Sequence, residues 1–346
     1  MEIRYPAQPD KYAPLAIYLN PEWVTWVRSL LYANLALHEG NLSGVDGSAL
    51  AHLDAAEAAA SSLPLWATSV VHVCRSQVLV RESRHREAVF WIRRVYTAAR
   101  QGYAHPAARS GAQLLRAKMR YDQARYAEAE HFLSSPLKTE GMTCPNWLNM
   151  TALLTGRQFV RSTGAESTHL LAQTFSRLAE ALGHVFIGYG DTSLLNTLSY
   201  NFSTNLLQGI RHELFPKSCT DIALQWLATN KLVCKKLGVG DDSVLADLLL
   251  IDIGWEFGCA VETWPELLRC GQNAKGNLNG VLERALAQAR RMGNRQEIAH
   301  CLWRQMRLAP SAELGRGAYL EAAEIYESLN RKDSSIQLAA EWKARF

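Results

Sequence analysis

The 346-residue sequence lacks the cysteine pattern of a disulfide-stabilised or zinc-binding protein. Its seven cysteines are odd in number and scattered, and no Cys-x-x-Cys pair occurs. Disulfide frameworks and thiolate zinc sites need paired or closely spaced cysteines, so this pattern indicates reduced thiols in a cytoplasmic protein. The first residues, Met1–Pro6, contain no apolar signal core, which favours the same compartment.

Long hydrophobic runs and a strong excess of one charge are also missing. The most apolar stretch, Val244–Trp255, is interrupted by Asp247 and Asp252, whereas a membrane span needs ~18 or more apolar residues. The net charge is only +4, and 48% of the residues are hydrophobic. Intrinsic disorder requires the opposite composition, so the chain is expected to fold around a large core without a membrane partner.

Signals of helix start and end recur along the chain. The first predicted helix begins at Pro21, after the capping residue Asn20, and ends before Gly40. We find no convincing alternating strand, and the pattern predicts about sixteen helices, or roughly 43 residues per helix pair, a length typical of helical repeats. The helices predicted towards the C-terminus cover 264–271, 278–292, 295–308, 317–329 and 333–345.

Three segments have the spacing of a helix pair that crosses at small residues. In the first, Leu115–Leu133, the aromatic, small and large side chains of the second helix are Tyr126, Ala129 and Leu133, and Ala117 is the small residue of the first helix. Alanine lets two helix backbones approach, and the large residues fill the space one turn away. This arrangement resembles a tetratricopeptide repeat (TPR).

The C-terminal segment Ile325–Ala340 resembles the same repeat. Tyr326 and Leu329 would close its first helix, Asn330 takes the turn position where glycine is usual, and Ser335 stands where alanine is usual. A competing register that uses Tyr326 in a second helix is less favoured, because it does not explain the turn.

The third segment, Leu282–Ala309, is similar to the repeats of signal-transducing bacterial regulators. Together the resemblances imply an all-α, TPR-like α-solenoid of about eight helix pairs; a generic helical bundle with alanine-rich crossings is the alternative. The predicted division is an N-terminal extension at 1–20, Arg-rich helical repeats at 21–138, a divergent helical middle at 139–277 and C-terminal TPR-like repeats at 278–346.

Basic residues concentrate in one segment. Residues 75–125 hold twelve Arg and Lys against three Asp and Glu, so this segment carries +9 and the rest of the chain −5. Within it, arginines recur every seven residues on one predicted helix and four residues apart on the next, which puts each set on one face. Guanidinium groups suit carboxylates and phosphates. The predicted partner-binding residues are Arg86, Arg93, Arg100, Arg116 and Arg120.

Pairs of glutamate and histidine are the second candidate for a functional site, in this case a metal site. Glu-x-x-His, a motif of di-iron helical bundles, occurs four times, but that chemistry also needs two further inward-facing carboxylates. We therefore predict structural or surface histidines. The four pairs are Glu82/His85, Glu128/His131, Glu166/His169 and Glu297/His300.

A third pattern is an acidic cluster, Asp241, Asp242 and Asp247. It resembles the magnesium-binding acids of all-helical prenyl-chain enzymes, but the second acidic motif of those enzymes is missing, and Asp242 or Ser243 is better explained as the cap of a helix that begins near Val244.

Further along that helix, Asp252 and Glu256 lie one turn apart and are interpreted as polar contacts between helices. The sequence contains no phosphate-binding loop, nucleophile elbow or His-Glu-x-x-His motif.

The sequence therefore predicts a non-enzymatic, cytoplasmic scaffold or regulatory module without cofactor or metal. It would recognise a peptide or helix of a partner protein through a basic face, and the expected partner is acidic; a nucleic-acid backbone is less favoured. The alternatives are a ligand- or peptide-sensing component of a transcription-control system and a helical metal-dependent enzyme. A solvated face that pairs with acidic parts of the same chain would also explain the arginines.

The first prediction concerns this basic face. Reversing Arg93 and Arg116 to glutamate should weaken binding of the partner without lowering the melting temperature, because the field of the face changes sign there. A titration of the double variant against the partner, with thermal melts alongside, tests it. Unchanged binding of the double variant would show that the basic face does not bind the partner.

Overall fold

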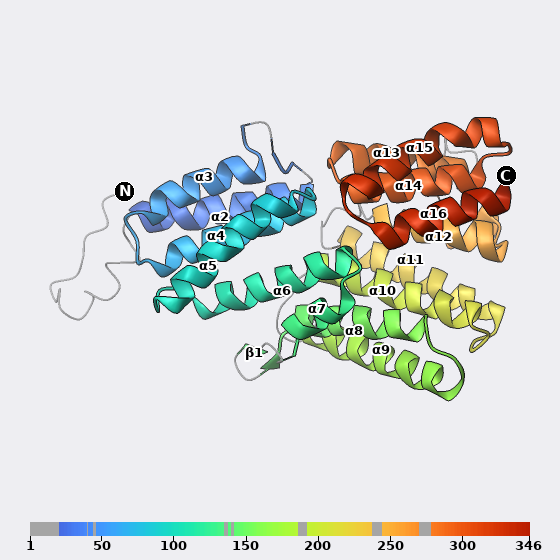
Figure 1. The fold of residues 1–346 in the computed structure, drawn as a ribbon, viewed down its shortest axis with the longest axis horizontal. Coiled ribbons are helices and arrows are strands. Elements are labelled where there is room, and N and C mark those ends of the chain that lie inside the picture. Colours follow the sequence, from blue (N-terminus) through green and yellow to red (C-terminus); the bar gives the residue numbers. More distant parts are fainter. Residues whose placement is uncertain are drawn as a thin grey trace. The chain divides into compact units, whose positions relative to one another are not determined.

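The computed structural model describes residues 21–39, 41–43, 46–134, 138–139, 142–185, 192–236, 244–269 and 278–346. Across these ranges the fold is helical, with fifteen α-helices, short 3-10 turns and one pair of two-residue strands (Figure 1). The strands β1 (Lys138–Thr139) and β2 (Met142–Thr143) pair antiparallel. The predicted all-α class is confirmed. No helix in these ranges is long and apolar enough to cross a membrane.

The chain forms two compact units, residues 1–115 and 116–346, and we describe each by itself. In the first unit, consecutive helices pack against each other, and the core near the start is aromatic. Trp23 and Trp26 stand edge to face at 5.3 Å, and both rings contact Trp66. The helices are α2 (Pro21–Glu39), α3 (Ala49–Ala60), α4 (Trp66–Arg81), α5 (His85–Arg100) and α6 (Pro106–Asp122), which continues into the second unit.

The second unit also pairs helices that follow one another in sequence, and its largest apolar cluster joins α10 to α14. It contains α7 (Tyr126–Phe132), α8 (Pro145–Phe159), α9 (Gly164–His184), α10 (Thr192–Arg211), the 3-10 turn η3 (Lys217–Cys219), α11 (Thr220–Lys236), α12 (Val244–Phe257), the 3-10 turns η4 (Val261–Thr263) and η5 (Glu266–Leu268), α13 (Leu278–Arg291), α14 (Arg295–Leu308), α15 (Ala312–Ser328) and α16 (Lys332–Arg345).

Two predicted helices differ from the structure. The helix expected at 264–271 is only the 3-10 turn η5, because the backbone is extended at Trp264 before it and at Arg269 after it. The helix expected to start at 317 begins at Ala312, because the Ser311 side chain accepts a hydrogen bond from the Leu314 N–H and caps it.

Four helix pairs are joined by the same three-residue turn. In each, the middle residue has a positive φ between 56° and 63°, and the next N–H donates to a carbonyl five residues back at 2.8–3.2 Å. This is the Schellman termination, which satisfies the last carbonyls of the first helix and lets the second start at once. It confirms the turn predicted at Asn330. The middle residues are Ser83, Ala124, Gly293 and Asn330.

One contact in the second unit joins segments far apart in the sequence. Asp122, at the end of α6, pairs with Arg331, before α16, at 3.3 Å, and both side chains are largely buried. Beside it, Tyr126 and Asp333, 207 residues apart, share a 3.4 Å hydrogen bond. A repeat array in which each pair touches only its neighbours would not make these contacts. They join the beginning and the end of this unit.

We expect the buried carboxylate of Asp122 to stabilise the second unit. Asp122→Asn should lower the free energy of unfolding by about 2–3 kcal/mol, because Arg331 then loses its buried counter-ion. The matched control is Asp333→Asn at the same contact, where the pair with Arg161 is exposed and should be worth less than ~1 kcal/mol. Equal effects of the two variants in denaturant titrations would contradict this reading.

Candidate partner-binding site

The basic face of the first unit is built on α5. One side of this helix is buried against α4 through Ala88, Ile92 and Val95. At 100° per residue, positions 86, 93 and 100 fall on the opposite side, so their arginine side chains face solvent.

These three arginines differ from their neighbours in what they contact. Arg75 is buried and pairs with Asp54 at 2.6 Å and with Glu57 at 2.9 Å, and Arg84 pairs with Glu82 and Glu87. In contrast, Arg86, Arg93 and Arg100 form no ion pair with any residue that the structure describes. Seven helical residues span about 10.5 Å, so the face presents three guanidinium groups in a row about 21 Å long. We define the α5 face as Arg86, Arg93 and Arg100.

Aromatic rings border the α5 face. The Arg94 guanidinium lies 4.9 Å from the ring centroids of both Phe90 and Trp91, and Arg75 stacks on Trp91 at 4.8 Å. Phe90 is half exposed. Sequence reasoning missed these residues, although the adjacent pairs Phe90-Trp91 and Arg93-Arg94 carried the signal. The face therefore combines free cations with an exposed ring, a mixture suited to peptide recognition.

Arg116 and Arg120 on α6 are engaged within the second unit. The Arg116 guanidinium lies 4.2 Å from the Phe132 ring, and its side chain is half-buried. Arg120 is 3.2 Å from the Glu128 carboxylate and donates to Gln123 at 2.9 Å. Both side chains connect α6 to the turn and helix that follow it. Reversing Arg116 would therefore alter packing as well as surface charge, so Arg93 is the cleaner position for a binding test.

The Glu-x-x-His pairs do not assemble. Glu82 hydrogen-bonds to Arg84, Glu128 pairs with Arg120 and Arg125, and His169 contacts Gln173. Within the described ranges, no group of three or more His, Cys, Asp or Glu side chains is placed to hold a metal ion.

The fourth pair contains a histidine with an unusual neighbourhood. His300 Nδ1 lies 2.6 Å from the Tyr326 hydroxyl, in the packing between α14 and α15. Burial lowers the pKa of His300 well below its usual range, and the positive charges of Arg304, Arg331 and Lys118 lower it further. The same cations would repel a metal ion, so His300 is a neutral structural residue.

Of the acidic pattern, the structure describes only Asp247, which lies in a contact between helices. Asp241, Asp242 and Ser243 lie outside the described residues, and Asp247 receives two hydrogen bonds from Arg284.

The predicted polar contacts of α12 are confirmed. Asp252 pairs with Arg304 and Arg307 of α14, and Glu256 pairs with Arg211 of α10. These carboxylates hold helices together. Five cysteines whose side chains the structure describes form no disulfide: Cys74, Cys144, Cys219, Cys259 and Cys301.

His300 should make stability depend on pH. Its pKa is depressed in the folded protein, so protonation favours the unfolded state: stability is complete above pH ~6.5 and falls as the pH drops below it, by at most about 1.4 kcal/mol per pH unit. In His300→Asn the pH-dependent loss of stability that comes from His300 should vanish. The stability profiles of the variant and the unchanged protein should stay parallel between about pH 7 and 8. Urea titrations of both proteins above and below pH 6.5 measure the free energy of unfolding at each pH. If this free energy has the same slope against pH in both proteins below pH 6.5, the prediction is wrong.

The sequence matches no protein-family model, and a search of curated proteins returns no match. The function therefore has to follow from the exposure, contacts and charge of the site residues.

Proposed function

We propose that the chain is a non-enzymatic, TPR-like helical-repeat module that binds an acidic segment of a partner protein through the α5 face. The observation that carries the proposal is the row of three exposed arginines that have no carboxylate partner among the described residues, on the side of α5 opposite its buried stripe. Guanidinium groups bind carboxylates with two parallel hydrogen bonds, and a like-signed row steers an acidic partner during approach.

The local geometry supports the repeat interpretation. At the first TPR-like pair, Ala117 and Ala129 are completely buried and Leu133 is almost so, as expected where two backbones cross closely. The same three-residue turn recurs four times, and helices pack mainly on their sequence neighbours. A repeating unit with one connection geometry is a property that helical-repeat proteins share.

The spacing of the α5 face restricts what can bind. A polyproline II segment advances about 3.1 Å per residue and returns to the same side at every third residue, so acidic residues at every third position would come close to the 10.5 Å step. A partner helix would match with acidic residues at every seventh position. Both are short acidic segments of a protein, and a row of like charges favours recognition by charge pattern.

A designed probe tests the function directly. A labelled helical peptide with glutamates at every seventh position should bind the full-length protein, and Arg93→Glu should weaken binding about tenfold, or ~1.4 kcal/mol, because an attraction becomes a repulsion at the centre of the row. The matched control is Arg316→Glu, an exposed arginine on α15 in the second unit, which should leave binding unchanged. Fluorescence anisotropy at several salt concentrations gives the affinities.

Three results would overturn the proposal. The first is no binding of the peptide, and the second is equal weakening by Arg93→Glu and Arg316→Glu. The third is tighter binding of a labelled single-stranded oligonucleotide than of the peptide, with a steep salt dependence, which would assign the face to a nucleic-acid backbone.

A further inference from the structure

The first described helix leaves an apolar face uncovered. Trp23, Trp26, Ala33 and Leu37 of α2 are buried against the core, but the opposite side exposes large hydrophobic side chains by 45–65%. Contiguous apolar side chains exposed on a folded protein mark a surface that binds other molecules. The α2 face is Val24, Val27, Leu31, Tyr32 and Leu35.

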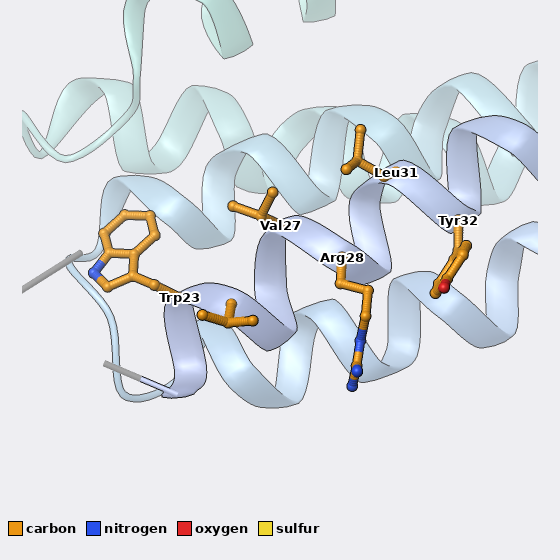
Figure 2. A pocket seen from close by; sticks show the side chains of 6 residues that line it. Trp23, Val27, Arg28, Leu31 and Tyr32 are labelled. Atoms are coloured by element: carbon orange, nitrogen blue, oxygen red, sulfur yellow. The ribbon is translucent and has the colours of Figure 1, made fainter. Parts of the chain in front are cut away.

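The α2 face borders a shallow hollow of about 510 Å³ that is lined by residues of this one helix (Figure 2). Figure 2 shows the Val27 and Leu31 side chains on one side of α2 and those of Arg28 and Tyr32 on the other. The apolar positions recur every three or four residues over three helical turns, about 16.5 Å. This is the pattern that one helix presents to another in ridges-into-grooves packing.

Arg28 gives the face its charge. It is the one charged residue between Val24 and Leu35, it is exposed, and it forms no ion pair with the residues that the structure describes. We infer that the α2 face binds an amphipathic helix of a partner protein, which contributes an apolar stripe and, beside it, a carboxylate that pairs with Arg28. This mode of recognition reads side chains three, four and seven residues apart.

A second copy of this chain fits the face less well. Two α2 faces would bring two Arg28 side chains together with no carboxylate between Val24 and Leu35 to pair with them. A face of three turns is also small beside the ~800 Å² per partner that a stable dimer buries. Charge complementarity and size thus favour a single acidic, amphipathic helix. The inference uses different residues from the α5 face, so it can fail or succeed without it.

The test exchanges the charge on both sides of the contact. The first probe is a synthetic amphipathic helix of about 18 residues with one leucine stripe and one flanking glutamate. A second peptide carries lysine in place of this glutamate. Full-length protein should prefer the glutamate peptide by about threefold, and Arg28→Glu should reverse the preference, as expected for one exposed ion pair.

Leu31→Asp should abolish binding of both peptides, whereas Leu314→Asp, at an exposed leucine of α15, should not change it. Non-specific apolar adhesion would give equal affinities for both peptides in both proteins and would overturn the inference, as would no binding. A dimer in sedimentation that Leu31→Asp dissociates would assign the face to a second copy instead. Faster trypsin cleavage after Lys11 in Leu31→Asp would assign it to the chain's own N-terminal residues.

Discussion

Four helix pairs of the structure depend on one constraint: a three-residue turn leaves the second helix to pack an apolar stripe on the first. When a helix starts directly after a Schellman turn, as at Ser83 or Asn330, it folds back antiparallel on the helix before it. The stripe is buried in that contact. Residues on the opposite side then face solvent whatever their chemistry, so the outer sides of the helices carry the positions that are free for recognition.

The second unit obeys a further constraint because it buries charge. Asp252 is 9% exposed and receives hydrogen bonds from Arg304 and Arg307, and Arg307 also pairs with Glu341. A buried ion is tolerated only when its partner and hydrogen bonds are in place, so such pairs select one arrangement of α12, α14 and α16. His300 stays neutral for the same reason, since it lies among cations.

Much of the fold follows from local signals in the sequence, and the failures have tertiary causes. Helical period and turn residues placed most helices, including the turn at Asn330. The helix expected at 264–271 failed because Trp264 is buried on an extended backbone and Leu268 is buried from the short 3-10 turn that follows it. The α15 helix starts five residues before the predicted position and contains Gly315; a β-carbon there would lie 3.3 Å from Trp342, so the glycine permits close packing inside a helix.

Which basic residues are free could not be read from the sequence, since an arginine's partner comes from another helix. The segment 75–125 has a net charge of +9, yet most of its Arg and Lys side chains form ion pairs, hydrogen bonds or ring contacts in the structure. Arg75 reaches α3, Arg81 donates to a carbonyl of α2, and Arg116 stacks on Phe132.

The prediction that these arginines pair with acidic parts of the same chain therefore holds in part: it explains Arg75, Arg84 and Arg120, and it does not explain the α5 face. Helical period alone placed Arg86, Arg93 and Arg100 on one side of α5. Only the contacts in the structure show that these three are unpaired while neighbouring arginines are paired. A small net charge can thus conceal a binding surface. What defines such a surface is the set of charges that the fold leaves unpaired, and three of those charges lie opposite the buried stripe of α5.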